Sequence, residues 1–481
     1  MGSRDFYSGY PARPPKGGLL WLLPLVAAVL VTMALVTGST FWAGEALFIP
    51  LAVLATAIGF ARTRLFGWQV AIPSFYLLFF GLIPVAESFV GLVDHAGNMR
   101  LDRPLIWMSA GLIVFVIAAR SVRASPFEPD ALGAMPDSSL GKTWFVLTLM
   151  LIGGWGFIYS ALYGYFGLGG ALTTLDPYAG AASVASGFVL LASVVAYSHF
   201  METRRWKWGS IAISATLVSI GVGLFTRSKG AILSPLMIPG LAYFNAKKRI
   251  PWLLIAVTAV AYLFVVYPFV TSWRNEGSPE YRSSAEQFQE GTMRLMSWEM
   301  FLDGEQGDGV RSLSRGLLTV MGDIVAETGT STPFEGGSTY WIGFEVMVPR
   351  FVWPGKPDMR VGNILGMKYG WIQSSDEITN IAPTLPGEAY VNFGPLGLLV
   401  LMAIMGGLAG WMDGPLTARM GKWFLTWSTL AGALGQESMF AHLVMPFART
   451  LLLILMLVGG VDLLLRTTGL AARRREVTVR E

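Results

Sequence analysis

Apolar runs of about 20 residues follow one another along most of the chain, separated by short turns that hold many of the lysines and arginines. Each run is long enough to cross the hydrocarbon core of a bilayer as an α-helix. Of the 481 residues, 53% are hydrophobic and only 14% are charged. Because backbone groups in lipid must be satisfied within the segment, the sequence predicts an all-α, polytopic helical membrane protein.

The apolar runs predict about twelve membrane spans, which leaves both termini on the same side. These spans cover residues 19–37, 41–61, 68–90, 104–120, 143–166, 181–200, 208–226, 231–246, 251–271, 389–411, 422–440 and 446–466. The first run follows a basic stretch, as in a signal peptide, but it is longer than such a core and lacks a convincing cleavage site. We therefore expect it to stay as the first span.

One long, less hydrophobic segment divides the spans into two groups. We expect nine spans in residues 1–271, a large extramembrane segment in 272–388, three spans in 389–466 and a tail in 467–481. Apolar residues recur at helical spacing in the large segment, at Leu313, Leu317, Val320 and Ile324. The segment is therefore expected to contain amphipathic helices lying at or near the membrane interface.

Basic turns set the orientation, because lysine and arginine are retained on the cytoplasmic side of a membrane. If the amino terminus is cytoplasmic, the inner segments contain Arg62, Arg64, Arg120, Arg123, Arg204, Arg205, Lys207, Lys247, Lys248, Arg249, Arg473, Arg474 and Arg475. This topology places residues 272–388 outside the cytoplasm. It also accounts for most of the basic residues behind the net charge of +4, so we expect no nucleic-acid partner.

A few cations lie on the outer side, where orientation does not require them. They are Arg100 and Arg103 in one turn, Arg227 and Lys229 in another, Arg449 at a span end, and arginines of the large segment such as Arg274, Arg294, Arg350 and Arg360. Guanidinium groups bind phosphate bidentately and stay charged in poorly hydrated places, which suits a lipid diphosphate. The alternatives are surface ion pairs for the segment arginines and snorkelling to lipid headgroups for Arg227 and Arg449.

Two side chains near outer span ends are candidates for proton transfer. Glu388 follows a Pro-Gly pair where the chain returns to the membrane, and a buried carboxylate there could act as a general base. The alternative is a glutamate placed at a helix start by the helix dipole. His442 lies at the outer end of the eleventh span and could accept a proton, or bond a helix carbonyl instead.

Several kinds of chemistry have no support in the sequence. There is no cysteine, so disulfides, thiolate metal sites and thiol nucleophiles are excluded. The signatures of zinc hydrolases, P-loop nucleotide sites and serine hydrolases are also missing. We expect no cofactor and assign no metal site.

Three stretches resemble the bacterial oligosaccharide repeat-unit polymerases, also called O-antigen polymerases. They are 348–357, which reads VPRFVWPGKP, 386–397, which reads PGEAYVNFGPLG, and the corner 225–230, FTRSKG. The span pattern with one large outer loop is similar as well, although about thirty residues carry the match. The related O-antigen ligases share this plan but place a key histidine in the large loop, and residues 272–387 contain none. The resemblance therefore favours a polymerase.

The resemblance implies a membrane-embedded, inverting glycosyltransferase of the C type in the bacterial inner membrane, with its site facing the periplasm. Donor and acceptor would both be undecaprenyl-diphosphate-linked oligosaccharides, and no cofactor is needed because the donor is already activated. A chain-length regulator and a flippase are the protein partners to expect.

The candidate roles follow from that reaction. We expect the leaving diphosphate to be held by Arg227, Lys229, Arg274, Arg350 and Arg449. Glu388 or His442 would take the acceptor proton. Further substrate contacts are expected from Arg294, Arg360, Trp353 and Tyr390.

Three other functions stay open at this point. The chain could be a ligase that transfers glycan to a lipid A core, a transporter or flippase, or a scaffold of a polysaccharide export complex. A transporter is expected to bury ionisable groups at mid-membrane and to interrupt its helices.

Overall fold

The computed structural model is helical, and a helix lies in every range where a span is expected. It describes residues 22–63, 65–90, 95, 98, 100–122, 139–163, 178–225, 229–262, 266, 316–348, 352–353, 355, 361–375, 379–437 and 439–467. The first helices are α1 (Leu22–Thr37), α2 (Thr40–Thr63), α3 (Trp68–Tyr76), η1 (Leu77–Leu82), α4 (Ile83–Val90), α5 (Asp102–Ser121), α6 (Ser139–Leu162), α8 (Ala179–Thr203), α9 (Trp206–Phe225), α10 (Lys229–Lys247) and α11 (Trp252–Ala261). The later ones are α16 (Leu317–Glu327), α17 (Ser338–Met347), α18 (Val361–Lys368), α19 (Leu385–Trp411), η4 (Met412–Leu416), α20 (Thr417–Met420), α21 (Lys422–Leu434), η5 (Gly435–Glu437) and α22 (Phe440–Thr467).

Seven helical segments in the described part of the chain are long and apolar enough to cross a membrane. They are Thr40–Thr63, Trp68–Phe89, Asp102–Ser121, Gly141–Ser160, Val184–Thr203, Trp206–Leu224 and Leu385–Met420. Shorter apolar helices cover Pro24–Thr37, Trp252–Ala261 and Phe447–Val461. These helices indicate a multi-pass membrane protein, as the sequence predicts, whereas the count of twelve crossings stays a prediction.

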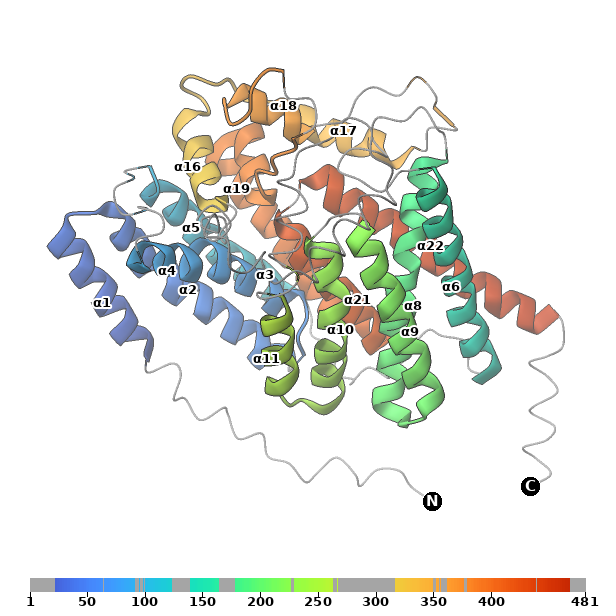
Figure 1. Cartoon of the computed structure of the whole chain (residues 1–481). Coiled ribbons are helices and arrows are strands. Elements are labelled where there is room, and N and C mark those ends of the chain that lie inside the picture. The colour runs from blue at the N-terminus through green and yellow to red at the C-terminus, as the bar shows by residue number, and fades with distance from the viewer. Residues whose placement is uncertain are drawn as a thin grey trace, which may run out of the picture.

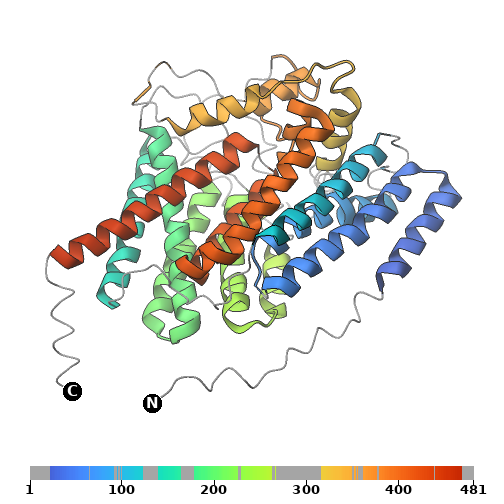
Figure 2. The same ribbon diagram turned by 180° about the vertical axis from the view of Figure 1, so that it is seen from behind.

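The two ends of the helical bundle are formed by different parts of the chain. Helices α16, α17 and α18 lie together at one end, and the α8–α9 and α10–α11 turns lie at the other (Figure 1). The view from behind shows the same arrangement (Figure 2). The basic turns around Arg205 and Lys248 are thus opposite the helices of the large segment. Which end faces the cytoplasm stays a prediction.

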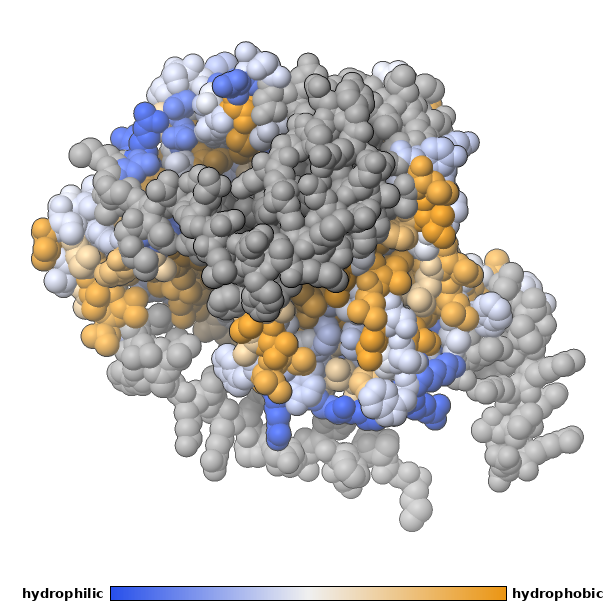
Figure 3. Space-filling view, viewed as in Figure 1, coloured by the Kyte–Doolittle hydropathy of each residue, from blue (hydrophilic) through white to orange (hydrophobic). Residues whose placement is uncertain are grey.

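The surface between the two ends is apolar. Figure 3 shows hydrophobic side chains at the left, in the lower middle and at the right of the visible face, and hydrophilic patches at its upper left and along its lower edge. Large apolar side chains such as Ile117, Leu151 and Leu396 are 62%, 72% and 70% exposed. So many exposed large apolar side chains are unusual on soluble monomers, and lipid contact accounts for them.

Helices α5 and α19 pack closely along the middle of the bundle. At Gly410, an added Cβ would come within 2.6 Å of the Ala119 carbonyl oxygen. Gly406, one turn earlier, approaches the Phe115 carbonyl oxygen even more closely. Small residues spaced four apart let two backbones approach in this way, so any larger residue there would push α19 away from α5.

Helix α16 bears on the helices expected in the large segment. It begins at Leu317 and so confirms a helix over part of the predicted apolar spacing, while Leu313 lies outside the described residues. Its Leu317, Met321 and Ile324 side chains are buried in the main core. The apolar face of this helix is covered by protein, because α16 packs on α5 and α19. Its place relative to the membrane interface stays a prediction.

Candidate functional site

Helix α19 is broken near its start, and the break shapes the site. Gly394 has φ 64° and ψ −152°, a backbone conformation that strongly favours glycine. Pro395 follows and has no N–H, so the Val391 carbonyl loses its helical donor. The Glu335 backbone N–H, just before α17, donates to that carbonyl at 3.1 Å instead. Residues 385–393 thus form a short half-helix whose free end is closed by the large segment.

Asn392 joins this half-helix to α17 through its side chain. Its Nδ2 donates to Thr339 Oγ1 at 2.7 Å and to the Glu388 carbonyl at 2.8 Å. Its Oδ1 accepts from the Gly337 N–H at 2.8 Å. The Asn392 side chain is 1% exposed, and its amide nitrogen and oxygen are both hydrogen-bonded. These three bonds fix the start of α17 beside Glu388.

Glu388 lies on the half-helix and is completely buried. Its Oε2 accepts a 2.6 Å hydrogen bond from the Phe440 N–H, which is the first residue of α22. Its Oε1 is buried and has no hydrogen-bond partner in the described part of the chain. A carboxyl in this state is costly to bury. Its Oε2 is bound to the start of α22, the Thr339 hydroxyl also interacts with the carboxyl, and Oε1 keeps no regular hydrogen bond among the described residues.

The surroundings of the carboxyl come from α17 and α22. The Thr339 hydroxyl lies beside it, and the Tyr340 ring meets the Phe440 ring edge-on at a centroid distance of 5.2 Å. Burial raises the pKa of the Tyr340 hydroxyl, and the nearby Glu388 charge raises it further. Tyr340 therefore stays protonated near neutral pH and is a hydrogen-bond donor next to the buried acid.

Helix α22 carries two further predicted residues. His442 lies two residues after Phe440, in the first turn, although its side chain is outside the described part of the structure. Arg449 is half-buried, and its Nε is buried with no hydrogen-bond partner among the described residues. Nine residues separate Arg449 from Phe440, which is about 13 Å along a helix. Arg449 is therefore on the same helix as the Glu388 contact but is not its ion-pair partner.

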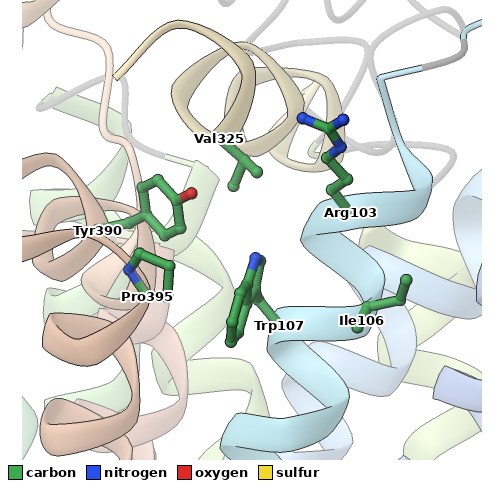
Figure 4. A pocket seen from close by; sticks show the side chains of 6 residues that line it. All are labelled: Arg103, Ile106, Trp107, Val325, Tyr390 and Pro395. Carbon is green, nitrogen blue, oxygen red and sulfur yellow. The ribbon is translucent and has the colours of Figure 1, made fainter. Parts of the chain in front are cut away.

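Tyr390 lies in a different place from Glu388, although both were predicted for one site. Residues that are two apart in sequence differ by about 200° around the axis of an α-helix. The side chains of Glu388 and Tyr390 therefore leave the half-helix on opposite sides. Tyr390 lines a pocket of about 390 Å³ with Arg103, Ile106, Trp107, Val325 and Pro395 (Figure 4). The structure thus separates a buried acid from a pocket that contains a cation.

Most of the predicted cations cannot be placed. Arg227, Arg274, Arg294, Arg350 and Arg360 lie outside the described residues, and so does the side chain of Lys229, at the start of α10. Trp353 is 39% exposed in the stretch that follows α17. The predicted convergence of arginines around one diphosphate stays a prediction.

Two charged or titratable side chains, Arg100 and His95, have partners in the structure that the sequence did not predict. Arg100 forms ion pairs with Asp323 and Glu327 of α16, at 3.4 and 3.3 Å. These pairs hold the turn before α5 against α16. His95 is buried, and its Nε2 lies 2.9 Å from Glu87 Oε2.

Other residues of the site were missed. Asn392 and Thr339 hold the buried acid in its surroundings, and Trp107 lines the pocket, but none was singled out from the sequence. Asn392 stands four residues after Glu388, a spacing that puts both on one helix face and could have pointed to it. No three histidine, aspartate or glutamate side chains meet as metal ligands in the described part of the chain.

The large segment has its own polar contacts near the site. Lys368 of α18 pairs with Glu335, whose other oxygen accepts from the Ser338 hydroxyl at 2.7 Å. Burial acts to raise the pKa of Glu335, but the Lys368 and Ser338 hydrogen bonds outweigh it and leave that pKa lowered. This ion pair connects α18 to residues 335–336, whose backbone N–H groups donate to carbonyls at the broken end of the half-helix.

Comparison with known proteins yields no relative. No family model matches the sequence, and neither a curated protein nor a solved structure matches it.

Proposed function

We propose that the protein is an inverting glycosyltransferase that polymerises undecaprenyl-diphosphate-linked oligosaccharide repeats. In this proposal it spans the bacterial inner membrane about twelve times, and its site faces the periplasm. The sequence resemblance to O-antigen polymerases supplies the reaction. The supporting observation from the structure is Glu388, a buried carboxyl with one oxygen bound to the start of α22 and the other without a hydrogen bond among the described residues.

The proposed step joins two lipid-linked glycans. An acceptor hydroxyl oxygen attacks the anomeric carbon of the growing chain, and the bond from that carbon to the phosphate oxygen breaks. Undecaprenyl diphosphate leaves with the bonding electrons, and Glu388 Oε1 takes the hydroxyl proton. Attack from the side opposite the leaving group inverts the anomeric centre.

The leaving diphosphate gains negative charge as the bond breaks, so fixed cations stabilise the transition state more than the ground state. Arg449 is a candidate because its Nε is buried and unpartnered among the described residues. Arg227, Lys229, Arg274 and Arg350 are proposed to act with it. Since Glu388 is buried, the proposal requires a movement that opens a path for the acceptor to its carboxyl.

The direct test is chain elongation by the purified protein. Incubation with a lipid-linked repeat is expected to yield carrier-bound dimers and longer ladders, and release of undecaprenyl diphosphate. Glu388→Gln keeps an oxygen for the Phe440 N–H but removes the proton acceptor, so elongation is expected to stop while the helix contact remains. Undiminished elongation by this variant would leave His442 as the better base, and His442→Ala tests that residue.

A lipid-linked oligosaccharide transporter is a second candidate, and two observations favour it. Glu45 in α2 is fully buried, and neither carboxyl oxygen has a partner within the described residues. Helix α19 is interrupted at Gly394. Buried ionisable groups and broken helices are common in transporters. Movement of a labelled lipid-linked repeat across vesicles without elongation, lost in Glu45→Gln but not in Glu388→Gln, would favour the transporter.

A further inference from the structure

A pocket at the junction of α5, α16 and α19 has no role in the proposed reaction. Arg103, Ile106 and Trp107 come from α5, Val325 from α16, and Tyr390 and Pro395 from α19. Its volume is about 390 Å³. The pocket borders the outer surface of the bundle, because Ile106 is 48% exposed. It is therefore reached from the side of the bundle without passing Glu388.

The polar lining of this pocket consists of donors. Figure 4 shows the Arg103 guanidinium, the Tyr390 hydroxyl and the Trp107 indole nitrogen directed towards the pocket. No carboxylate is among the six lining residues. Arg103 has no ion pair with any described residue, whereas Arg100, one turn away, is paired with Asp323 and Glu327. An unpaired guanidinium beside two neutral donors suits a ligand that is anionic and rich in acceptors, such as a phosphate.

The apolar lining indicates where that phosphate comes from. Ile106, Val325 and Pro395 form the rest of the wall, and Leu396, next to Pro395, is 70% exposed on the apolar surface of α19. Arg103 is in the first turn of a predicted span, where headgroups of a bilayer are expected. Tryptophan and tyrosine concentrate at this depth because their rings are apolar and their tips are polar.

We propose that this pocket binds an anionic phospholipid, with its phosphate on Arg103 and Tyr390 and an acyl chain along Ile106 and Pro395. The proposal does not depend on the glycosyltransferase reaction. Tyr390 and Glu388 share the half-helix 385–393, so a bound lipid would also restrain the half-helix that carries the buried acid.

The test uses the full-length protein in detergent and two probes, phosphatidylglycerol and phosphatidylcholine with brominated acyl chains. Bromine quenches nearby tryptophan, and the difference between wild type and Trp107→Phe isolates the signal of this pocket. Phosphatidylglycerol is expected to quench Trp107 at about tenfold lower concentration than phosphatidylcholine. Equal quenching by both lipids would overturn the proposal.

Variants locate the anion contact. Arg103→Gln is expected to weaken phosphatidylglycerol binding about tenfold, and the matched control Arg100→Gln to leave it unchanged. The proposal fails if both variants bind alike, or if Arg103→Gln binds as the wild type does. Should Arg103→Gln not fold, the comparison of the two lipids on the wild type decides. Displacement of the lipid by millimolar inorganic phosphate would show a free-anion site and overturn the lipid assignment.

Discussion

Two buried acids in the segment Leu385–Met420, Glu388 before the break at Gly394 and Asp413 after it, are held in different ways. Asp413 in η4 accepts from the Trp68 N–H at 2.8 Å through Oδ1 and from the Gln69 N–H at 2.7 Å through Oδ2. Both of its oxygens therefore accept hydrogen bonds from the first backbone N–H groups of α3. Glu388 closes the start of α22 with one oxygen and keeps the other unpartnered among the described residues.

The difference separates a structural acid from a candidate reactive one. A buried carboxyl stabilises a fold when each oxygen has a donor, and it is costly when one does not. Asp413 also lies in a region supported by Arg62, which donates to Gln69 Oε1 and to the Ala119 and Val122 carbonyls. Glu388 has no such cation among the described residues, and its Oε1 has no hydrogen bond there, which is why we propose a reactive role for it and not for Asp413.

Replacing Glu388 by Gln is expected to have the largest effect on activity. We expect elongation to fall by about 10²–10⁴-fold, the usual contribution of a general base, with little change in thermal stability. The rate of ladder formation and the melting temperature in detergent measure the two. A variant that melts much earlier and elongates normally would show that Glu388 is structural like Asp413.

Replacing Asp413 by Ala is expected to affect stability most. It strands the Trp68 and Gln69 N–H groups, and the free energy of unfolding should fall by about 2–4 kcal/mol. Asp413→Asn keeps one acceptor and should lose roughly half as much. Thermal unfolding in detergent checks the order of the two variants. If Asp413→Ala melts with the wild type, the contrast with Glu388 disappears.

Asn392→Ala tests what holds the surroundings of Glu388. It removes bonds to Thr339, to the Glu388 carbonyl and to the Gly337 N–H, so unfolding should become easier by about 1–3 kcal/mol. Elongation should fall together with stability, because α17 is no longer fixed beside the acid. Asn392→Asp retains an acceptor for Gly337 and is the matched control. Full activity and stability in the alanine variant would contradict this role.

Loss of the Glu335–Lys368 ion pair is expected to change stability least, and its contribution should depend on pH. The pKa of Glu335 is lowered in the fold, so its contribution is present above the usual value of 4.5 and is lost as the pH falls through the lower folded pKa. Because the pair is partly exposed, we expect a contribution of about 1 kcal/mol or less. Melting temperatures between pH 6 and pH 3 measure it, since Glu335→Gln should flatten the acid part of the curve. An unchanged curve would show that the pair adds nothing.

The sequence alone predicted the helical class and the positions of the helices, because membrane-length apolar runs are a local property. The basic turns likewise predicted which helix ends lie together, and α8–α9 and α10–α11 do meet at one end of the bundle. Glu388 was singled out from its place after a Pro-Gly pair. These features depend on residues that are close in the chain.

The remaining features were decided by contacts between distant residues. Asp413 binds an amide 345 positions away, and Glu388 binds one 52 positions away, so no spacing in the sequence marks which oxygen is free. The locations of Tyr390 and Glu388 were decided in the same way, since rotation about α19 sends Tyr390 to the α5 pocket and Glu388 to the start of α22. Their shared role in one site stays a prediction. Hydropathy determines which segments become helices in the membrane, but the packing of α5, α16, α17 and α22 around the broken α19 determines which polar groups are buried and which keep an unused hydrogen-bonding atom.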